Sequence, residues 1–122
     1  MKIKTVNTIL YCQRWKETVA FYQSQLKLPV TMANEWFIEF ELNETSRLSV
    51  ANEARASIKS YGGKGITITM EVDDIYATQS FLNEAGIDPA TIKEHAWGSK
   101  VIHIYDPEGS RLEFWCQNKK ID

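Results

Sequence analysis

The chain has 122 residues, of which 43% are hydrophobic and 25% charged, and its formal net charge is −2 at pH 7. This length and composition are typical of one globular domain that buries its own core. Basic residues are scattered among acidic ones, with neither a basic stripe nor a polybasic helix, which argues against nucleic acid and membrane surfaces as partners.

The first half of the chain predicts one strand, one helix and three further strands. Residues 6–12 contain β-branched and aromatic residues in alternation, which predicts a strand. Residues 14–26 place Trp15, Val19 and Leu26 at helical spacing, which predicts an amphipathic helix. Three short apolar runs predict the remaining strands, at residues 30–34, 36–42 and 47–51.

The second half predicts the same order of elements. Residues 66–72 read as a strand and residues 75–85 as a helix. Asp73 is expected to cap the N-terminus of this helix, and Gly86 to end it. The last three predicted strands lie at residues 91–94, 100–105 and 111–116.

The two halves are interpreted as copies of one βαβββ unit. Residues 7–29 align with residues 67–89 at a constant offset of 60, and residues 47–50 (RLSV) match residues 111–114 (RLEF) after a four-residue insertion. We therefore predict one α+β domain over residues 1–122, with module one at 1–52, a polar linker at 53–63 and module two at 64–122. Each helix covers one face of its sheet, so tandem modules predict curled mixed sheets around a cleft.

Two motifs resemble the glyoxalase/bleomycin-resistance (vicinal oxygen chelate) superfamily. The first is Val19-Ala20-Phe21-Tyr22 followed by Leu26-Lys27-Leu28-Pro29, and the more specific second one is DPEGSRLEF at residues 106–114. One departure is Gln13, where the superfamily often has Asp. Without that Asp, the first helix lacks a side-chain cap worth about 1 kcal/mol.

The resemblance also implies where a metal would lie. In metal-dependent members, one divalent ion is held by residues from the first and last strand of each unit, and these positions correspond here to Asn7, Ser49, Thr67 and Glu113. Only Glu113 is a strong ligand for such an ion. A neutral amide and two hydroxyls supply neither charge nor imidazole. The chain is thus expected to resemble the metal-free, bleomycin-resistance-like members, with one divalent metal ion as the alternative.

Three residues of the last hairpin are the strongest candidates for chemistry. Glu113 would accept a hydrogen bond from a cationic or hydroxylated ligand or act as a base, and in isolation its pKa would be raised. It could instead form an ion pair with Arg111 that has no functional role. His103 lies ten residues earlier, on the neighbouring strand of a hairpin. In extradiol dioxygenases of the superfamily this spacing often carries an active-site tyrosine, so the resemblance implies that His103 shares the cleft with Glu113. There it would transfer protons with Glu113 or act as a hydrogen-bonded filler. Trp115 shares the strand face of Glu113 and would stack on a planar ligand or pack in a core or dimer contact, and Trp97 in a loop would form a lid.

The favoured function is metal-free binding of a small aromatic or polar organic molecule in an inter-module or inter-subunit cleft. The expected ligand-binding residues are Asn7, Ser49, Thr67, His103, Glu113 and Trp115. The alternative is a lyase, isomerase or dioxygenase of the same superfamily that uses Glu113 and His103, with or without a divalent metal. A third reading is a partner-binding module whose cleft is vestigial.

The remaining expectations concern partners and location. Relatives usually complete their clefts between two chains, so the resemblance implies a homodimer. We expect neither a nucleic acid nor a membrane partner, because the N-terminal apolar run is too short to span a bilayer and lacks a secretory cleavage site. Cys12 and Cys116 are the only cysteines, which favours a reducing cytoplasm.

Overall fold

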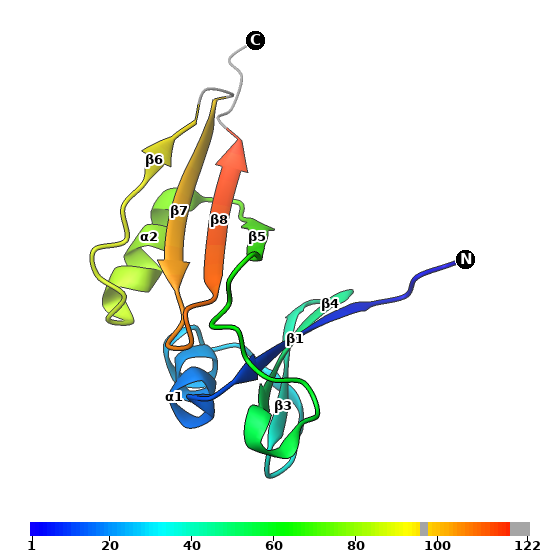
Figure 1. Cartoon of the computed structure of the whole chain (residues 1–122). Helices are drawn as coiled ribbons and strands as arrows, with labels where there is room; N and C mark the ends of the chain where they lie inside the picture. The colour runs from blue at the N-terminus through cyan, green and yellow to red at the C-terminus, as the bar shows by residue number, and fades with distance from the viewer. Residues whose placement is uncertain (96–97, 118–122) are drawn as a thin grey trace. The chain divides into compact units, whose positions relative to one another are not determined.

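Two four-stranded sheets, one from each half of the chain, form the framework of the protein (Figure 1). The computed structural model describes residues 1–95 and 98–117. The chain divides into two compact units. Unit 1 contains Met1–Lys64 together with the turn Asp106–Ser110, and unit 2 contains Gly65–Tyr105 and the residues from Arg111 onward.

Unit 1 has the strand order β1-β4-β3-β2, with β1 parallel to β4 and the other pairs antiparallel. The helix α1 continues without a break into a π-helical segment, η1. A short 3₁₀ turn, η2 (Glu53–Arg55), follows the last strand. The elements of the unit are β1 (Val6–Cys12), α1 (Trp15–Ala20), η1 (Phe21–Gln25), β2 (Val30–Ala33), β3 (Phe37–Asn43) and β4 (Ser46–Asn52).

Unit 2 repeats this topology with the order β5-β8-β7-β6, and β5 is parallel to β8. Its elements are β5 (Thr67–Glu71), α2 (Ile75–Glu84), β6 (Lys93–Glu94), β7 (Ser99–Tyr105) and β8 (Arg111–Gln117). The predicted α+β class with two βαβββ units is therefore confirmed. None of the helices in the described part of the chain is long and apolar enough to cross a lipid bilayer.

The helix caps differ from the prediction by one residue. Asp74, not Asp73, caps α2, and its side-chain Oδ1 accepts hydrogen bonds from the backbone N–H groups of Tyr76 and Ala77 at 3.0 and 3.2 Å. The residue 60 positions earlier, Arg14, is the N-cap of α1 and makes no capping hydrogen bond with its side chain. The expectation that the first helix lacks its own side-chain cap is therefore correct, although the position is Arg14 rather than Gln13.

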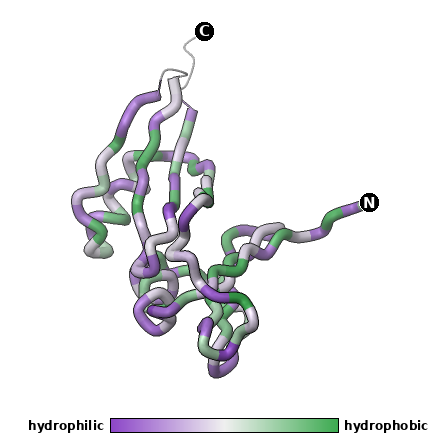
Figure 2. Tube along the Cα trace, in the orientation of Figure 1, coloured by the Kyte–Doolittle hydropathy of each residue, from purple (hydrophilic) through white to green (hydrophobic). Residues whose placement is uncertain are grey.

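Each sheet buries one face against its helix, because hydrophobic and hydrophilic residues alternate along the strands (Figure 2). In unit 1 the rings of Tyr22 and Phe40 are 6.0 Å apart, and Leu48 pairs with Phe40 across the sheet. In unit 2, α2 packs against β7 and β8. The fully buried residues that form this core are Ile75, Leu82, Ile102 and Leu112. Burial of each such side chain contributes about 1.5–3 kcal/mol.

Candidate functional site

The face of the unit 2 sheet opposite the buried Ile102 and Leu112 carries mainly polar and aromatic side chains. Side chains alternate along a strand, so the odd-numbered residues of β5, β7 and β8 share this face. The register aligns them in three rows across the three strands, and we call them together the polar face of unit 2. The rows are Thr67–Arg111–Tyr105, Thr69–Glu113–His103 and Glu71–Trp115–Val101.

Glu113 lies at the centre of this face and makes two hydrogen bonds. The His103 Nε2 lies 2.8 Å from Glu113 Oε2, and the Thr69 hydroxyl donates to Oε1 at 2.7 Å. The side chains of His103 and Glu113 are only 18% and 23% exposed. The two residues that the sequence proposed as catalytic candidates are therefore in direct contact and partly shielded from water.

The pKa of Glu113 is lowered, contrary to the expectation for an isolated carboxylate. Partial burial alone would raise this pKa. The hydrogen bonds from Thr69 and His103 and the positive charges of His103 and Arg111 outweigh that effect. Glu113 is therefore ionised near neutral pH and acts as a hydrogen-bond acceptor.

Arg111 competes with Glu113 for the same histidine nitrogen. Its Nη2 lies 2.8 Å from His103 Nε2, which is also the atom that contacts Glu113. A single ring nitrogen either carries a proton and donates or presents its lone pair and accepts. The two contacts cannot both be hydrogen bonds in the same state.

The corresponding face of unit 1 has a different chemistry. Its rows are Asn7–Arg47–Glu41, Ile9–Ser49–Glu39 and Tyr11–Ala51–Phe37. Ser49 is fully buried and donates to the Asn7 side-chain oxygen at 2.8 Å. The Asn7 amide and the Thr31 hydroxyl donate to the Glu39 carboxylate at 3.3 and 2.8 Å. Ser49 and Glu39 thus stand where unit 2 has Glu113 and His103.

The predicted ligand positions fit a divalent metal poorly. Asn7 and Ser49 are hydrogen-bonded to each other, while both oxygens of Glu113 accept hydrogen bonds from its neighbours. Thr67 is exposed and pairs with Arg111 in the sheet, and Thr69 makes the contact with Glu113 instead. Over residues 1–95 and 98–117, no three His, Cys, Asp or Glu residues gather as a metal would require.

Several residues of the site were missed or undervalued by sequence reasoning. Thr67, not Thr69, is the threonine that the sequence predicts for this site, and Arg111 is expected there only as an alternative partner of Glu113. His95, which the sequence does not single out, is exposed, and its ring centroid lies 6.4 Å from that of His103. Trp115 does share a strand face with Glu113, whereas Trp97, the predicted lid, lies outside the described residues. Only the parallel pairing of β5 with β8 places Thr69 directly beside Glu113.

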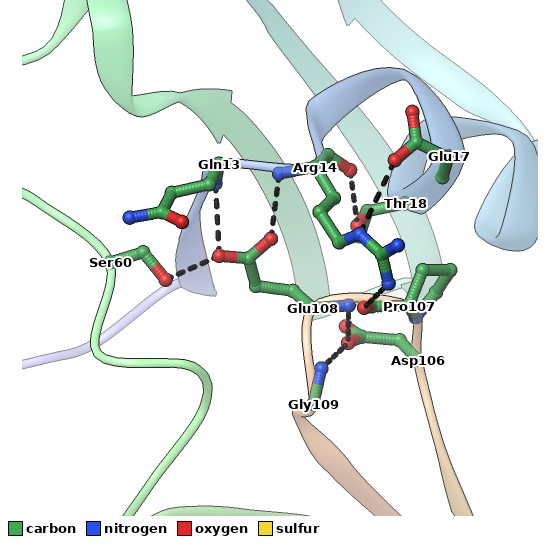
Figure 3. A network of polar contacts seen from close by, with 9 residues as sticks. All are labelled: Gln13, Arg14, Glu17, Thr18, Ser60, Asp106, Pro107, Glu108 and Gly109. Atoms are coloured by element: carbon green, nitrogen blue, oxygen red, sulfur yellow. Dashed lines mark hydrogen bonds and ion pairs between the residues drawn. The ribbon is translucent and has the colours of Figure 1, made fainter.

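A second polar network, in unit 1, explains the aspartate of the DPEGSRLEF motif (Figure 3). The Asp106 Oδ1 accepts hydrogen bonds from the backbone N–H groups of Glu108, Gly109 and Ser110 at 2.9, 3.0 and 2.9 Å. Its Oδ2 accepts a hydrogen bond from the buried Tyr22 hydroxyl at 2.7 Å. Burial and the adjacent carboxylate raise the pKa of Tyr22 far above its ordinary value. Asp106 is therefore a structural anchor of the turn.

Glu108 supplies the cap that α1 lacks (Figure 3). Its carboxylate accepts hydrogen bonds from the backbone N–H groups of Gln13 and Arg14 at 2.9 and 2.8 Å, and from the Ser60 hydroxyl at 2.5 Å. Partial burial alone would raise the pKa of Glu108, but these hydrogen bonds and the charge of Arg14 lower it. A carboxylate more than ninety residues away thus stabilises the positive end of this helix.

Glycines allow this turn to pack closely against the segment after η2. A Cβ at Gly63 would lie 2.4 Å from the Ser110 Cα, and a Cβ at Gly109 would lie 2.7 Å from the Gly62 carbonyl oxygen. Gly63 and Gly109 also have φ angles of +73° and +103°, which disfavour any other residue. The DPEG turn is therefore a packing element of unit 1.

Comparisons with known proteins cover most of the chain. Residues 5–116 match the family model described as a glyoxalase-like domain. A glyoxalase/bleomycin resistance protein from Catenulispora acidiphila is 23% identical with a TM-score of 0.74, covering 93% of this chain and 98% of that one. A lactoylglutathione lyase from Agrobacterium tumefaciens is 15% identical with a TM-score of 0.70, covering 91% of each chain. A glyoxalase family protein from Enterococcus faecalis is 22% identical with a TM-score of 0.68, covering 93% of this chain and 96% of that one. Comparison with curated proteins gives no match.

Proposed function

This chain belongs to the glyoxalase-like family, within the vicinal oxygen chelate superfamily that its motifs predicted, and on this premise we propose that it binds a small aromatic or polar organic molecule without a metal. The proposed site is the polar face of unit 2. Glu113 and His103 hold a polar group of the ligand, and Trp115 stacks on its ring. The family by itself does not select a ligand, because one fold serves many chemistries.

The observation that carries this proposal is the half-buried pair of His103 and Glu113, whose facing atoms are 2.8 Å apart. An ionised carboxylate with restricted access to water binds a hydroxyl or a cationic group more strongly than an exposed one does. Trp115 lies two residues further along the same strand, about 7 Å away along the strand. An aromatic ring at that distance suits a bicyclic planar ligand.

The donor chemistry favours the metal-free form of this proposal. At the positions that the superfamily uses for its metal, this chain offers an amide, two hydroxyls and one carboxylate. Of these donors, the Asn7 oxygen, the Ser49 hydroxyl and both Glu113 oxygens already take part in hydrogen bonds within the chain. A divalent ion would have to break these hydrogen bonds without gaining a second anionic ligand.

Isothermal titration calorimetry with 2-naphthol tests the proposal. Binding to the unmodified protein should weaken about tenfold in Glu113→Gln, because the hydrogen bond to a charged acceptor is lost. The matched control is Glu39→Gln, which removes a carboxylate from the corresponding face of unit 1 and should leave the affinity unchanged. Equal affinities of the two variants, or no binding of 2-naphthol to the unmodified protein, would contradict the proposal.

Proton-transfer catalysis is the second candidate function, and the contact between His103 and Glu113 favours it. A carboxylate that orients a histidine is a recurrent arrangement for moving protons near neutral pH. His103 would carry the proton, because the lowered pKa of Glu113 makes that carboxylate a weak base. Deuterium incorporation next to the carbonyl of 2-tetralone, followed by NMR, should be accelerated by the protein and by Glu39→Gln but not by His103→Gln. Equal rates with and without protein would exclude this activity for 2-tetralone.

We also propose that the protein forms a homodimer in a reducing cytoplasm. The edge strands of unit 1, β1 and β2, carry apolar side chains that are 37–57% exposed, namely Val6, Ile9, Val30 and Met32. Such exposed edges favour contact with another chain. Both cysteines are free thiols, Cys12 fully buried and Cys116 partly buried. Light scattering on the purified protein should give twice the 14.0 kDa mass of one chain.

A further inference from the structure

We propose that Arg111 recognises a carboxylate of the bound molecule, an inference that rests on the proposed function. Arg111 lies in the middle of the first row of the polar face of unit 2, beside the row of Glu113. It is half-buried, and the neighbours in its row, Thr67 and Tyr105, are exposed. Their hydroxyls are additional donors for an anionic oxygen.

The guanidinium of Arg111 has a donor without an acceptor. Its Nε is buried and has no hydrogen-bond partner within the described parts of the chain. A buried donor that is left unpaired costs free energy, and more so when it is charged. Over these same residues, Arg111 also makes no ion pair with a carboxylate within 4.0 Å. A ligand that satisfies this N–H group of Arg111 must therefore supply a hydrogen-bond acceptor.

The contact with His103 leaves the cluster incompletely satisfied in every protonation state. When Nε2 of His103 carries a proton, it donates to Glu113, and the N–H of Arg111 faces another N–H. When Nε2 is unprotonated, its lone pair accepts from Arg111, and the Glu113 carboxylate loses the hydrogen bond from His103. An incoming acceptor that takes Arg111 away from His103 resolves the conflict and leaves His103 as a donor to Glu113.

The equivalent arginine of unit 1 does not show this pattern. Arg47 stands 64 positions earlier in the repeat, and its Nη1 donates to the backbone oxygens of Asn43 and Ser46 at 2.6 and 3.2 Å. Its Nη2 lies 3.7 Å from the Glu41 carboxylate. Each arginine follows a turn and directly precedes a leucine. Of the two, only Arg111 has a buried donor without a hydrogen-bond partner. Arg47 is therefore a matched structural control.

A carboxylate matches the donors of the Arg111 guanidinium better than a neutral group does. The Nε–H and Nη2–H of a guanidinium point along one edge, and a carboxylate accepts both in parallel. Because Nε is closed to solvent in this conformation, we expect binding to draw the guanidinium outward from His103. The ligand class that follows is a planar hydroxyaryl carboxylate, with its hydroxyl at Glu113 and its carboxylate at Arg111.

Calorimetry with 3-hydroxy-2-naphthoate and its uncharged amide, 3-hydroxy-2-naphthamide, tests the inference. The carboxylate should bind about tenfold more tightly than the amide, the low end of the contribution of hydrogen bonds to charged groups. Arg111→Gln should abolish this preference, Arg111→Lys should retain only part of it because lysine lacks the paired N–H groups, and Arg47→Gln should retain all of it. On the unmodified protein, the NMR signal of the Arg111 Nε–H should shift downfield with the carboxylate only.

The outcomes separate this inference from the proposed function. If both compounds bind with equal affinity, or if Arg111→Gln keeps the preference, the role of Arg111 is wrong while ligand binding at this face stands. If Arg47→Gln loses the preference as well, the effect is general electrostatics and not recognition by Arg111. If neither compound binds, both the inference and the proposed function fail.

Discussion

Replacement of Glu108 by glutamine tests the long-range cap of α1 most directly. The two backbone donors at the helix start contact different oxygens, Gln13 on Oε2 and Arg14 on Oε1. Glutamine has one acceptor oxygen, so it would keep one of these hydrogen bonds and turn an N–H group toward the other donor. Loss of one hydrogen bond to a charged group costs about 1.5–3 kcal/mol, and the half-buried position favours the lower part of this range. We expect Glu108→Gln to reduce the free energy of unfolding by about 2 kcal/mol.

The effect should depend on pH with a defined sign. The pKa of Glu108 is lower in the folded protein than the ordinary value of 4.5. A carboxyl group with a depressed folded pKa stabilises the fold at pH values above its unfolded pKa, and this contribution is lost as the pH falls through the folded pKa. The difference in stability between the unmodified protein and Glu108→Gln should therefore be constant near neutral pH and should shrink below about pH 4.5.

Urea denaturation followed by circular dichroism at several pH values measures both effects. In thermal unfolding, the same loss of about 2 kcal/mol corresponds to a decrease in Tm of about 8 °C for a domain of this size. Glu17→Gln is the matched control, because Glu17 is an acid of the same helix in a largely exposed ion pair with Arg14. This control should change the free energy of unfolding by less than about 0.5 kcal/mol. Equal effects of the two variants, or a difference that does not shrink in acid, would refute the capping role of Glu108.

Three further predictions concern other contacts. Gly63→Ala should be less stable than Gly65→Ala in thermal unfolding. Both glycines have a positive φ, but only a Cβ at Gly63 would overlap backbone atoms. This overlap should cost about 1–3 kcal/mol more. Tyr22→Phe should cost about 1–3 kcal/mol in urea denaturation, since it leaves the buried aspartate of the DPEG turn short of a donor; an unchanged midpoint would argue against this anchor. His103→Leu should raise the pKa of Glu113 in a carbon-13 NMR titration, because it removes a hydrogen bond and a positive charge that lower this pKa. A pKa that stays the same would show that Glu113 does not depend on this contact.

The strands, the repeat and the family were accessible from the sequence. Residues 6–12 were predicted as a strand with the observed bounds, since alternation with period two is a local property of a half-buried strand. The pairing of Ser49 with Glu113 across the repeat also agrees with the strand register in both units. The family resemblance implied that His103 and Glu113 lie on the same side of neighbouring strands, and the strand register pairs them directly. The prediction placed the cap of α2 one residue early, because Asp73 and Asp74 are chemically equivalent and only the backbone conformation distinguishes them.

The sequence by itself therefore determined the elements, their order and the chemical character of each strand face, because these depend on residues close together in the chain. Only the tertiary structure decided which distant groups meet. Parallel pairing of β5 with β8 brings Thr69 rather than Thr67 to Glu113. The hydrogen bond from Thr69, together with His103 and Arg111, reverses the predicted direction of the pKa shift of Glu113. Packing of the DPEG turn provides the missing cap of α1. Such contacts join segments tens of residues apart, and no local periodicity records which atoms the folded chain will place within hydrogen-bonding distance.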